Sequence, residues 1–172
     1  MPKKNKTPVV GIVMGSDSDL PVMQETARLL EELNVPYEME IASAHRAPDR
    51  AAEYARSAAG RGLRVIVAGA GGAFHLAGVV AAHTTLPVIA VPLAGSPLAG
   101  LDALLAAVQM PGGVPVGVMA VGKAGAVNAG IFAAQILATS DQTLGRRLAQ
   151  YKEKLAREVA VKNARLKTPE AP

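Results

Sequence analysis

The sequence predicts an α/β domain in which helices cover both faces of a parallel sheet, followed by a long C-terminal helix. Two observations lead to this fold class. Short apolar segments alternate along the chain with segments of helical periodicity, which is typical of a doubly wound parallel sheet. Half of the 172 residues are apolar but only 3% are aromatic. The core must therefore consist mainly of small aliphatic side chains, which suits helices packed closely on such a sheet.

Five short apolar segments, bounded by glycine, proline or polar residues, are predicted to be the strands. Four of them contain no charged side chain, as expected of strands that are buried on both faces. The second contains Glu38 and Glu40 and alternates weakly between polar and apolar residues. The predicted strands are residues 9–14, 37–42, 65–68, 87–91 and 116–121.

The segments between these strands carry helix signals. Ser16 and Asp19 can cap a helix after the first strand, and Pro21 and Pro48 suit the first turns of helices. The glycine-rich residues 69–72 are predicted to form a turn after the third strand. The predicted helices are residues 21–33, 48–60, 73–83, 98–109 and 124–138.

The predicted helix 124–138 is apolar nearly all round. After Ala124, its polar side chains are Asn128 and Gln135, which are seven residues apart and therefore on one face. A helix of this kind is buried nearly all round, and a domain of this size has little room for that. We therefore expect contacts between subunits at this helix, and also at residues 98–108, where Asp102 is the only charge.

From residue 141 the composition becomes that of a long amphipathic helix with one narrow apolar stripe. Its stripe consists of Leu144, Leu148, Tyr151, Leu155 and Val159. This helix could pack along its own subunit or reach a neighbouring one. The chain is thus divided into a disordered tail (1–7), an α/β catalytic domain (8–140), an amphipathic helix (141–166) and a second tail (167–172).

The charge distribution argues against nucleic acid as a partner. The net charge is +4, but the basic excess lies in the two terminal segments. Residues 7–140 contain seven basic and ten acidic side chains. No basic stripe crosses the predicted fold, as nucleic-acid binding would require.

Other function classes and locations are also disfavoured. The chain has no cysteine, and its three histidines lack the spacing of a metal site. No signal peptide is evident. Residues 65–101 carry no charged side chain, but glycines and prolines divide them into pieces too short to cross a bilayer. These observations indicate a cytoplasmic protein without a metal or a membrane partner.

Two apparent nucleotide motifs fail on inspection. Residues 117–124 resemble a phosphate-binding loop, but Ala124 stands where a Ser or Thr must reach magnesium, and the residues between the glycines are strand-like. Residues 69–74 begin like a dinucleotide fingerprint but place Phe74 where a third glycine or alanine is needed. We therefore do not expect NAD as a cofactor.

Three polar or glycine-rich segments follow predicted strands, at residues 15–19, 43–46 and 69–75. Ligands of open α/β sheets bind outside the carboxyl ends of the strands, so these segments are expected to share one site. Ser16 could merely cap a helix, or it could bind phosphate at a helix N-terminus. The carboxylate of Asp19 would suit a ribose hydroxyl.

His45 lies in the second of these segments, beside Ser43 and Arg46. Imidazole can give and take a proton near neutral pH, and the planar fork of an arginine suits phosphate. His75, in the third segment, could face the same pocket or serve as a structural residue at a subunit contact. The segment around His45 is therefore the predicted proton-transfer and anion-binding site.

Five ordered motifs together resemble the class I PurE family over about residues 9–151. They are residues 14–19, 43–46, 69–73, 108–111 and 122–125. The resemblance implies a flavodoxin-like sheet and a homo-octamer whose active sites lie between subunits. It also implies conversion of N5-carboxyaminoimidazole ribonucleotide to 4-carboxy-5-aminoimidazole ribonucleotide in purine synthesis, without metal, ATP or organic cofactor.

The resemblance also implies roles for individual residues. His45 would be the acid and base, and Asp19 would hold the ribose. The 5′-phosphate would be held by Ser16, Ser43 and Arg46. The base and carboxylate region would be lined by His75 and the backbone of Ala70 and Gly71.

The chain departs from the family pattern at Phe74, usually a small residue, and at Ala77, usually proline. Both flank His75, so Phe74 is expected to crowd or reshape the cover of the carboxylate, and Ala77 to loosen it. Two alternatives remain. One is a carboxylase that uses free CO2 and aminoimidazole ribonucleotide; residues 71–73 with 75–76 resemble the mutase class instead. The other is a non-catalytic nucleotide-binding oligomer, which would not need His45.

Overall fold

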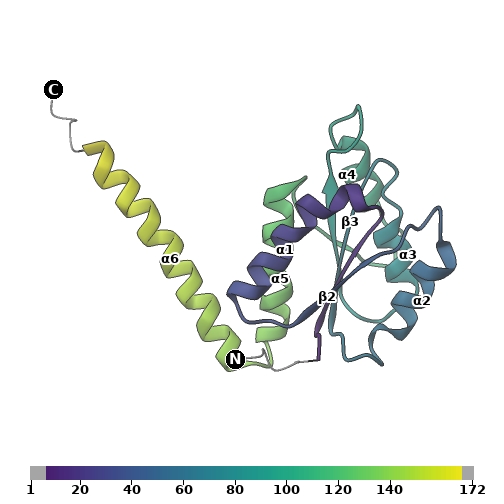
Figure 1. The fold of residues 1–172 in the computed structure, drawn as a ribbon, viewed down its shortest axis with the longest axis horizontal. Helices are drawn as coiled ribbons and strands as arrows, with labels where there is room; N and C mark the ends of the chain where they lie inside the picture. Colours follow the sequence, from purple (N-terminus) through teal and green to yellow (C-terminus); the bar gives the residue numbers. More distant parts are fainter. Residues whose placement is uncertain (1–6, 168–172) are drawn as a thin grey trace.

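The computed structural model describes residues 7–167, in which five parallel strands form one sheet (Figure 1). The strands are β1 (Val10–Met14), β2 (Tyr37–Ile41), β3 (Val65–Gly71), β4 (Val88–Leu93) and β5 (Gly117–Val118). Their order is β2-β1-β3-β4-β5. The chain thus places β2 on one side of β1 and β3 on the other. This change of direction is the position at which doubly wound sheets bind ligands.

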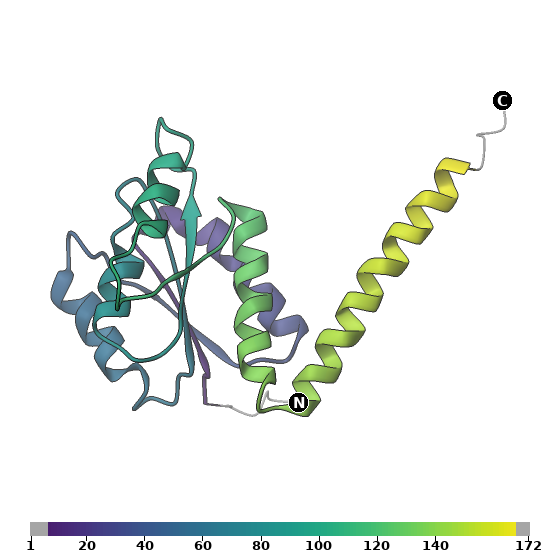
Figure 2. The ribbon, with the colours of Figure 1, turned by 180° about the vertical axis from the view of Figure 1, so that it is seen from behind.

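Helices cover both faces of the sheet, which confirms the predicted fold class (Figures 1 and 2). One face carries α1 (Leu20–Glu32) and α5 (Lys123–Ala138), and the other carries α2 (Pro48–Ala58), α3 (Leu76–Ala82) and α4 (Leu101–Val108). A short 3-10 helix, Asp17–Asp19, precedes α1. Each face has its own core of mainly aliphatic buried side chains, because alternate residues of a strand point to opposite faces.

The predicted turn at residues 69–72 is wrong for its first three residues, which extend β3. Gly69 pairs with Met14 and Val91, and Gly71 pairs with Leu93. Gly69 is a glycine because α1 lies close to the strand there: a Cβ atom would overlap the sulfur of Met23. Within this segment, only Gly72 adopts the left-handed conformation that favours glycine, with φ +60°.

Other elements are shorter than predicted, among them the fourth helix, which begins at Leu101 rather than at residue 98. Only Gly117 and Val118 of the last predicted strand pair with β4, at Ile89 and Ala90. Beyond them regular pairing ends, although the amides of Met119 and Gly122 still donate to the Ala90 and Pro92 carbonyls of β4 at 2.9 and 2.8 Å. The third helix begins at Leu76 rather than at residue 73, so residues 72–75 form an irregular loop between β3 and α3.

Only one face of α5 is buried within the chain, and it consists of small residues that let α1 approach closely. The hydroxyl of buried Thr26 donates a hydrogen bond of 2.7 Å to the carbonyl of Ala126, and a Cβ atom on Gly130 would approach the Leu29 side chain to 2.9 Å. Phe132 on the opposite face is exposed. Of the exposed residues of α5, only Ala124 and Phe132 are apolar, so the subunit contact expected at this helix stays a prediction.

The C-terminal helix α6 (Gln142–Lys167) packs on its own subunit only through its first part. Leu144 and Leu148 are buried in the same core as α1 and α5, whereas Val159 is 66% exposed. The rest of the helix projects away from the domain (Figures 1 and 2). Apart from Thr7 and Lys167, the predicted tails lie outside the described residues. No helix within residues 7–167 is long and apolar enough to span a bilayer.

Candidate active site

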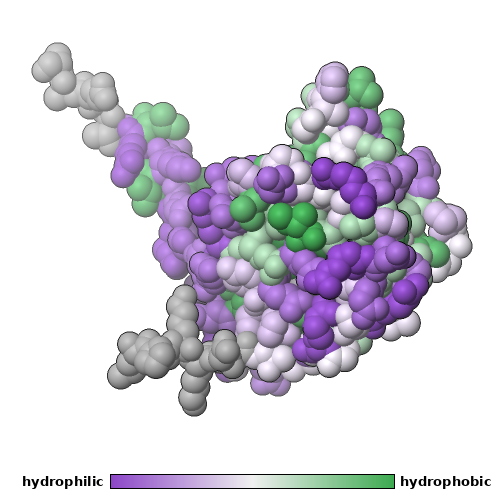
Figure 3. Space-filling model, turned by 45° about the vertical axis from the view of Figure 1, so that its right-hand side comes forward, coloured by the Kyte–Doolittle hydropathy of each residue, from purple (hydrophilic) through white to green (hydrophobic). Residues whose placement is uncertain are grey.

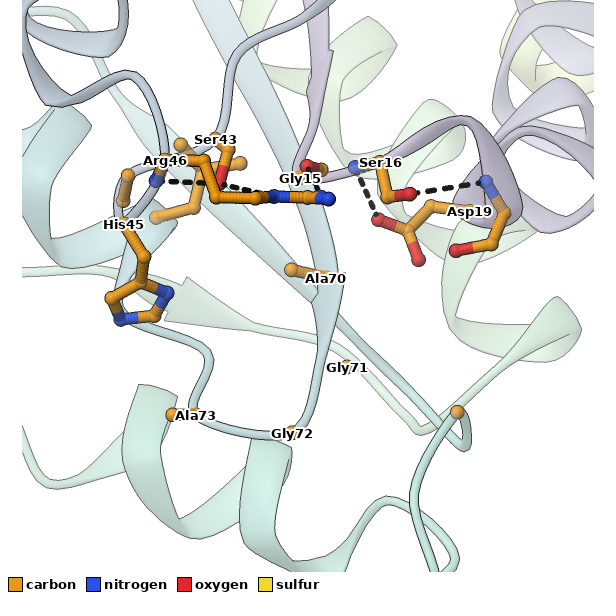
Figure 4. Close-up of a pocket in the computed structure, with 14 residues that line it drawn as sticks. Gly15, Ser16, Asp19, Ser43, His45, Arg46, Ala70, Gly71, Gly72 and Ala73 are labelled. Carbon is orange, nitrogen blue, oxygen red and sulfur yellow. Dashed lines mark hydrogen bonds between the residues drawn. The ribbon is translucent and has the colours of Figure 1, made fainter.

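A cavity of about 470 Å³ opens at the carboxyl ends of the strands, where the three predicted segments meet (Figure 4). It lies at the change of direction between β1 and β3. Its lining residues are Gly15, Ser16, Ser18, Asp19, Ser43, Ala44, His45, Arg46, Ala70, Gly71, Gly72, Ala73, Leu76 and Gly95. The prediction that these separate stretches lie together is therefore confirmed by the geometry.

The β1 side of the cavity is a capping box. The amide of Ser16 donates to the Asp19 carboxylate at 3.0 Å, and the Ser16 hydroxyl accepts from the amide of Ser18 at 3.4 Å and donates to Asp17 at 2.9 Å. Ser16 thus caps a helix, which is one of the two roles that its position in the sequence suggested. The capping box also holds the hydroxyl and carboxylate at the cavity wall.

The two carboxyl groups of this box differ in environment. Burial raises the pKa of Asp19 above its ordinary value of 3.8, against the opposing effects of hydrogen bonds from Ser16 and Gly15 and the charge of Arg46. Asp17 faces solvent, and the hydrogen bond from Ser16 lowers its pKa. Asp19 is therefore the half-buried carboxylate that a ligand would meet in this wall.

Arg46 spans the gap between the β2 and β1 ends of the site (Figure 4). Its Nη2 donates to the carbonyl of Gly15 at 3.1 Å, and its Nε is 3.5 Å from the hydroxyl of Ser43. The Arg46 amide also donates to that hydroxyl, at 3.2 Å. The contacts with Gly15 and Ser43 thus hold the guanidinium in place. Its remaining N–H donors face the cavity, where they are suited to binding an anion.

His45 follows Ser43 in the same loop, and its ring meets that of His75. His45 Nε2 is 2.8 Å from His75 Nδ1, with the rings inclined by 69°. His75 is not among the lining residues of the cavity; it reaches the site through His45. One of the two facing nitrogens must carry a proton and the other must accept it. The pair is thus a ready path for proton exchange at the cavity rim.

The floor of the cavity is the end of β3. Ala70 and Gly71 expose small surfaces there, and Gly71 cannot carry a side chain freely, since a Cβ atom would be 3.2 Å from the Leu93 carbonyl and 3.3 Å from the Gly95 amide. Ala44, Ala73 and Leu76 add further apolar wall. This end of the cavity suits a small, weakly polar group.

Phe74 does not crowd the cavity, contrary to expectation. Its side chain is only 1% exposed and points into the core beneath α2, α3 and α4, as does that of Ala77. The expected reshaping of the cover by Phe74 is therefore wrong. The reason is the direction of the residue within an irregular loop, in which Ala73 and His75 face outward and Phe74 faces inward.

Some lining residues escaped sequence analysis. Gly95 follows β4, so the rule that identified the other three segments could have found it. Leu76, just beyond the predicted segment 69–75, carries no chemical signal, and only the tertiary fold shows that it lines the cavity. Lys123, in the rejected phosphate motif, forms an ion pair of 3.2 Å with Glu25 at the start of α5. Residues 7–167 contain no cluster of three potential metal ligands.

Together, the fold and the site define an α/β protein of the doubly wound class, with a cavity at the carboxyl ends of its strands that is lined by a guanidinium, a half-buried carboxylate and an imidazole. Comparison with known proteins narrows this class. The sequence profile described as AIR carboxylase matches residues 9–158, which is most of the chain. The chain belongs to the AIR carboxylase family.

Individual relatives agree with this assignment. The N5-carboxyaminoimidazole ribonucleotide mutase of Bacillus subtilis is 58% identical over 146 residues, which cover 85% of this chain and 90% of that protein. The phosphoribosylaminoimidazole carboxylase of Schizosaccharomyces pombe is 60% identical over 139 residues, 81% of this chain but only 25% of that protein. The crystal structure of Treponema denticola PurE, 26% identical, matches with a TM-score of 0.83 over 94% of this chain and 99% of that one.

Proposed function

We propose that this chain is an isomerase of purine biosynthesis that converts N5-carboxyaminoimidazole ribonucleotide to 4-carboxy-5-aminoimidazole ribonucleotide. The mutase name of the Bacillus subtilis relative, which aligns with 85% of the chain, supports this activity. The observation that carries the proposal is the position of His45 on the wall of the cavity that also contains Arg46 and Asp19. One ligand could thus contact an anion-binding group, a carboxylate and a proton carrier.

The polar end would hold the ribonucleotide. The guanidinium of Arg46 and the hydroxyls of Ser43 and Ser16 would bind the 5′-phosphate, since charge-assisted hydrogen bonds to phosphate are strong. Asp19 would accept hydrogen bonds from the ribose hydroxyls. The contacts of Arg46 with Gly15 and Ser43 support this role, because they hold the guanidinium in place before binding.

The imidazole of His45 would carry the single proton that the reaction moves. Protonated His45 would donate to the carbamate nitrogen, whose bond to the carboxyl carbon then breaks to give aminoimidazole ribonucleotide and CO2. Carbon 4 of the ring would attack that CO2 and form the new bond. His45, now neutral, would take the proton from carbon 4, which restores the aromatic ring and the protonated imidazole. Atoms and charge balance without another reactant.

The apolar end would retain the CO2 between the two steps. Its wall is built from Ala44, Ala70, Gly71, Ala73 and Leu76, none of which offers a charged side chain. Holding both fragments in contact makes the second step effectively unimolecular, which is the main catalytic advantage available to such a site. The backbone of Ala70 and Gly71, with His75 behind His45, would border the reacting carboxylate.

The active unit would be a homo-oligomer, and we propose an octamer in the cytoplasm. In residues 7–167, α4 and its approach expose a row of leucines and a valine that a monomer would leave in water. Leu98, Leu101, Leu105 and Val108 are all more than half exposed. The protruding part of the surface shows some of its apolar side chains at one edge, among less hydrophobic ones (Figure 3). An exposed apolar patch of this kind marks an interaction site.

A second candidate is a carboxylase that uses free CO2 and aminoimidazole ribonucleotide. The name of the Schizosaccharomyces pombe relative and the description of the matching family favour it. Both activities pass through aminoimidazole ribonucleotide and CO2 held together in the site. They differ in the source of the CO2, which comes from solution in the carboxylase and from the carbamate in the mutase.

Turnover of both substrates by the purified chain, without ATP, separates the candidates. The carbamate ribonucleotide should be converted at micromolar to millimolar concentration, whereas aminoimidazole ribonucleotide should react only when bicarbonate supplies abundant CO2. Faster turnover of the second pair at equal concentrations would favour the carboxylase. If the chain binds the nucleotides but converts neither substrate, the remaining interpretation is a non-catalytic nucleotide-binding oligomer.

A further inference from the structure

Phe74 is the largest of the fully buried side chains in residues 7–167, yet it belongs to a surface loop at the active site. Its neighbours Ala73 and His75 are both exposed. Ala73 lines the cavity, and His75 contacts His45. A single aromatic side chain therefore passes from the loop that borders the reacting groups into the core.

Besides Phe74, this loop is held at its end by His75, whose carbonyl accepts the amide of Val79 in α3 at 2.9 Å and whose ring contacts His45. Residues 72–75 belong to no helix or strand, and the turn within them is closed by one hydrogen bond, from the His75 amide to the Ala73 carbonyl at 2.8 Å. Gly72, with φ +60°, begins the loop in the left-handed conformation that favours glycine. A buried aromatic side chain supplies the large apolar contact that holds such a segment in one conformation.

The core that receives Phe74 also holds the loop of His45. The same cluster of side chains contains Ala42, immediately before that loop, and Ala44 packs against it within the loop. Leu76 at the start of α3 belongs to it as well. The loops that carry His45 and His75 thus pack on the same hydrophobic core. The distance between the two loops therefore depends on how that core is packed.

We infer that Phe74 is a positioning residue for the proton-transfer pair. Its ring fixes loop 72–75 so that His75 Nδ1 stays within hydrogen-bond distance of His45 Nε2 and Ala73 stays in the cavity wall. Phe74 contacts neither the substrate nor the reacting atoms. Its catalytic effect, which rests on the proposed isomerase activity, passes through His75.

Three variants test this role. Phe74→Ala removes the ring, and Phe74→Leu retains most of the apolar bulk. Leu63→Ala is the matched control, because Leu63 is 2% exposed in the same core cluster but does not line the cavity. Thermal unfolding, kcat and KM for the carbamate ribonucleotide, and imidazole nitrogen NMR shifts without added nucleotide are measured for each variant.

Phe74→Ala should lower kcat by about tenfold to a hundredfold, since a displacement of ~1 Å in a positioned group can cost that much. KM should change by less than about threefold, because the phosphate and ribose contacts come from other loops. The nitrogen shifts of His45 and His75 should move toward those of imidazoles in water. Phe74→Leu should restore most of kcat, and Leu63→Ala should lower thermal stability but leave kcat and the shifts unchanged.

Other results would overturn the inference. A folded Phe74→Ala protein with native kcat and native imidazole shifts would show that Phe74 only fills the core, and so would an equal loss of kcat in Leu63→Ala. If Phe74→Ala does not fold, Phe74→Val takes its place in the same comparison. The NMR measurement needs no substrate, so it tests the positioning even if the proposed isomerase activity fails in the native protein.

Discussion

The ring nitrogens His45 Nε2 and His75 Nδ1 lie 2.8 Å apart, although the residues are thirty positions apart and follow different strands. Their contact joins the loop after β2 to the loop after β3, across the rim of the cavity. Because a hydrogen bond between two imidazoles needs one protonated and one bare nitrogen, each ring fixes the tautomer that the other can adopt.

The first prediction concerns His45. His45→Asn keeps a polar side chain of similar reach but cannot carry a proton at neutral pH, so turnover should fall by at least about a hundredfold. The affinity for aminoimidazole ribonucleotide should stay within about threefold of the native value, because the phosphate contacts are intact. Steady-state kinetics and calorimetric titration check both outcomes. Undiminished turnover would remove His45 from the mechanism.

The second prediction concerns its partner. His75→Leu removes the nitrogen that holds the His45 ring, and kcat should fall by about tenfold to a hundredfold, less than in His45→Asn. His75 does not line the cavity, so nucleotide affinity should be retained. Combining both substitutions should cost little more than His45→Asn alone, since residues that act as a unit are not additive. Additive losses would mean that the two rings act independently.

The third prediction concerns the phosphate. Arg46→Ala should weaken the binding of aminoimidazole ribonucleotide by about tenfold to a hundredfold, as expected when a charged hydrogen-bond donor is lost. Binding of the corresponding nucleoside, which lacks the phosphate, should hardly change. Arg50→Ala is the control, because Arg50 pairs with Glu40 at 2.7 Å and does not line the cavity. Equal affinities for the nucleotide in Arg46→Ala and native protein would refute the assigned role.

The fourth prediction is a pH dependence. Burial raises the pKa of Asp19 above 3.8, so the Asp19 carboxylate is protonated at a higher pH in the folded protein than in an unfolded chain. Ionised Asp19 therefore destabilises the fold slightly, and this cost disappears as the pH falls through the raised pKa. Nucleotide affinity should change in the opposite direction, because the ribose hydroxyls need the carboxylate as acceptor.

Affinity for aminoimidazole ribonucleotide should thus fall as the pH is lowered toward about 4, with a midpoint above 3.8. Asp19→Asn should bind more weakly at neutral pH and lose this part of the pH dependence. The two proteins can be compared by titration calorimetry over the same pH range. A native affinity that stays constant through this range would show that Asp19 does not hold the ribose.

The place of the candidate site could be predicted from the sequence, because ligands of open α/β sheets bind outside the carboxyl ends of the strands, and only the direction of the chain is needed to find those ends. Segments 15–19, 43–46 and 69–75 each follow a strand, and parallel strands bring their carboxyl ends to one edge. The contact between His45 and His75 could not be predicted, since ring orientation depends on how two loops pack. Gly69 was ambiguous for a related reason: a glycine can mark a turn or a close approach, and only the position of Met23 decides between them.

Phe74 shows the same limit more sharply. In a helix or strand, periodicity predicts which side chains point inward. Residues 72–75 have no such periodicity, so neighbouring side chains can point either way, and a departure from the family pattern looked like an obstruction of the cavity. Because the Phe74 side chain points into the core, it leaves the cavity open and instead holds its loop to the domain.

The fifth prediction concerns assembly. The native chain should sediment as an oligomer, because the half-exposed leucines on α4 would each gain roughly half of the ~1.5–3 kcal/mol that burial of a fully exposed leucine provides. Leu105, which is 52% exposed, is a suitable probe. Leu105→Asp would place a charge in that interface and should shift sedimentation toward smaller species, with a loss of turnover per chain if sites lie between subunits. Arg56→Asp, on the exposed side of α2, should leave the assembly intact. A native monomer that is stable at micromolar concentration and fully active would refute both the subunit contacts and the shared sites.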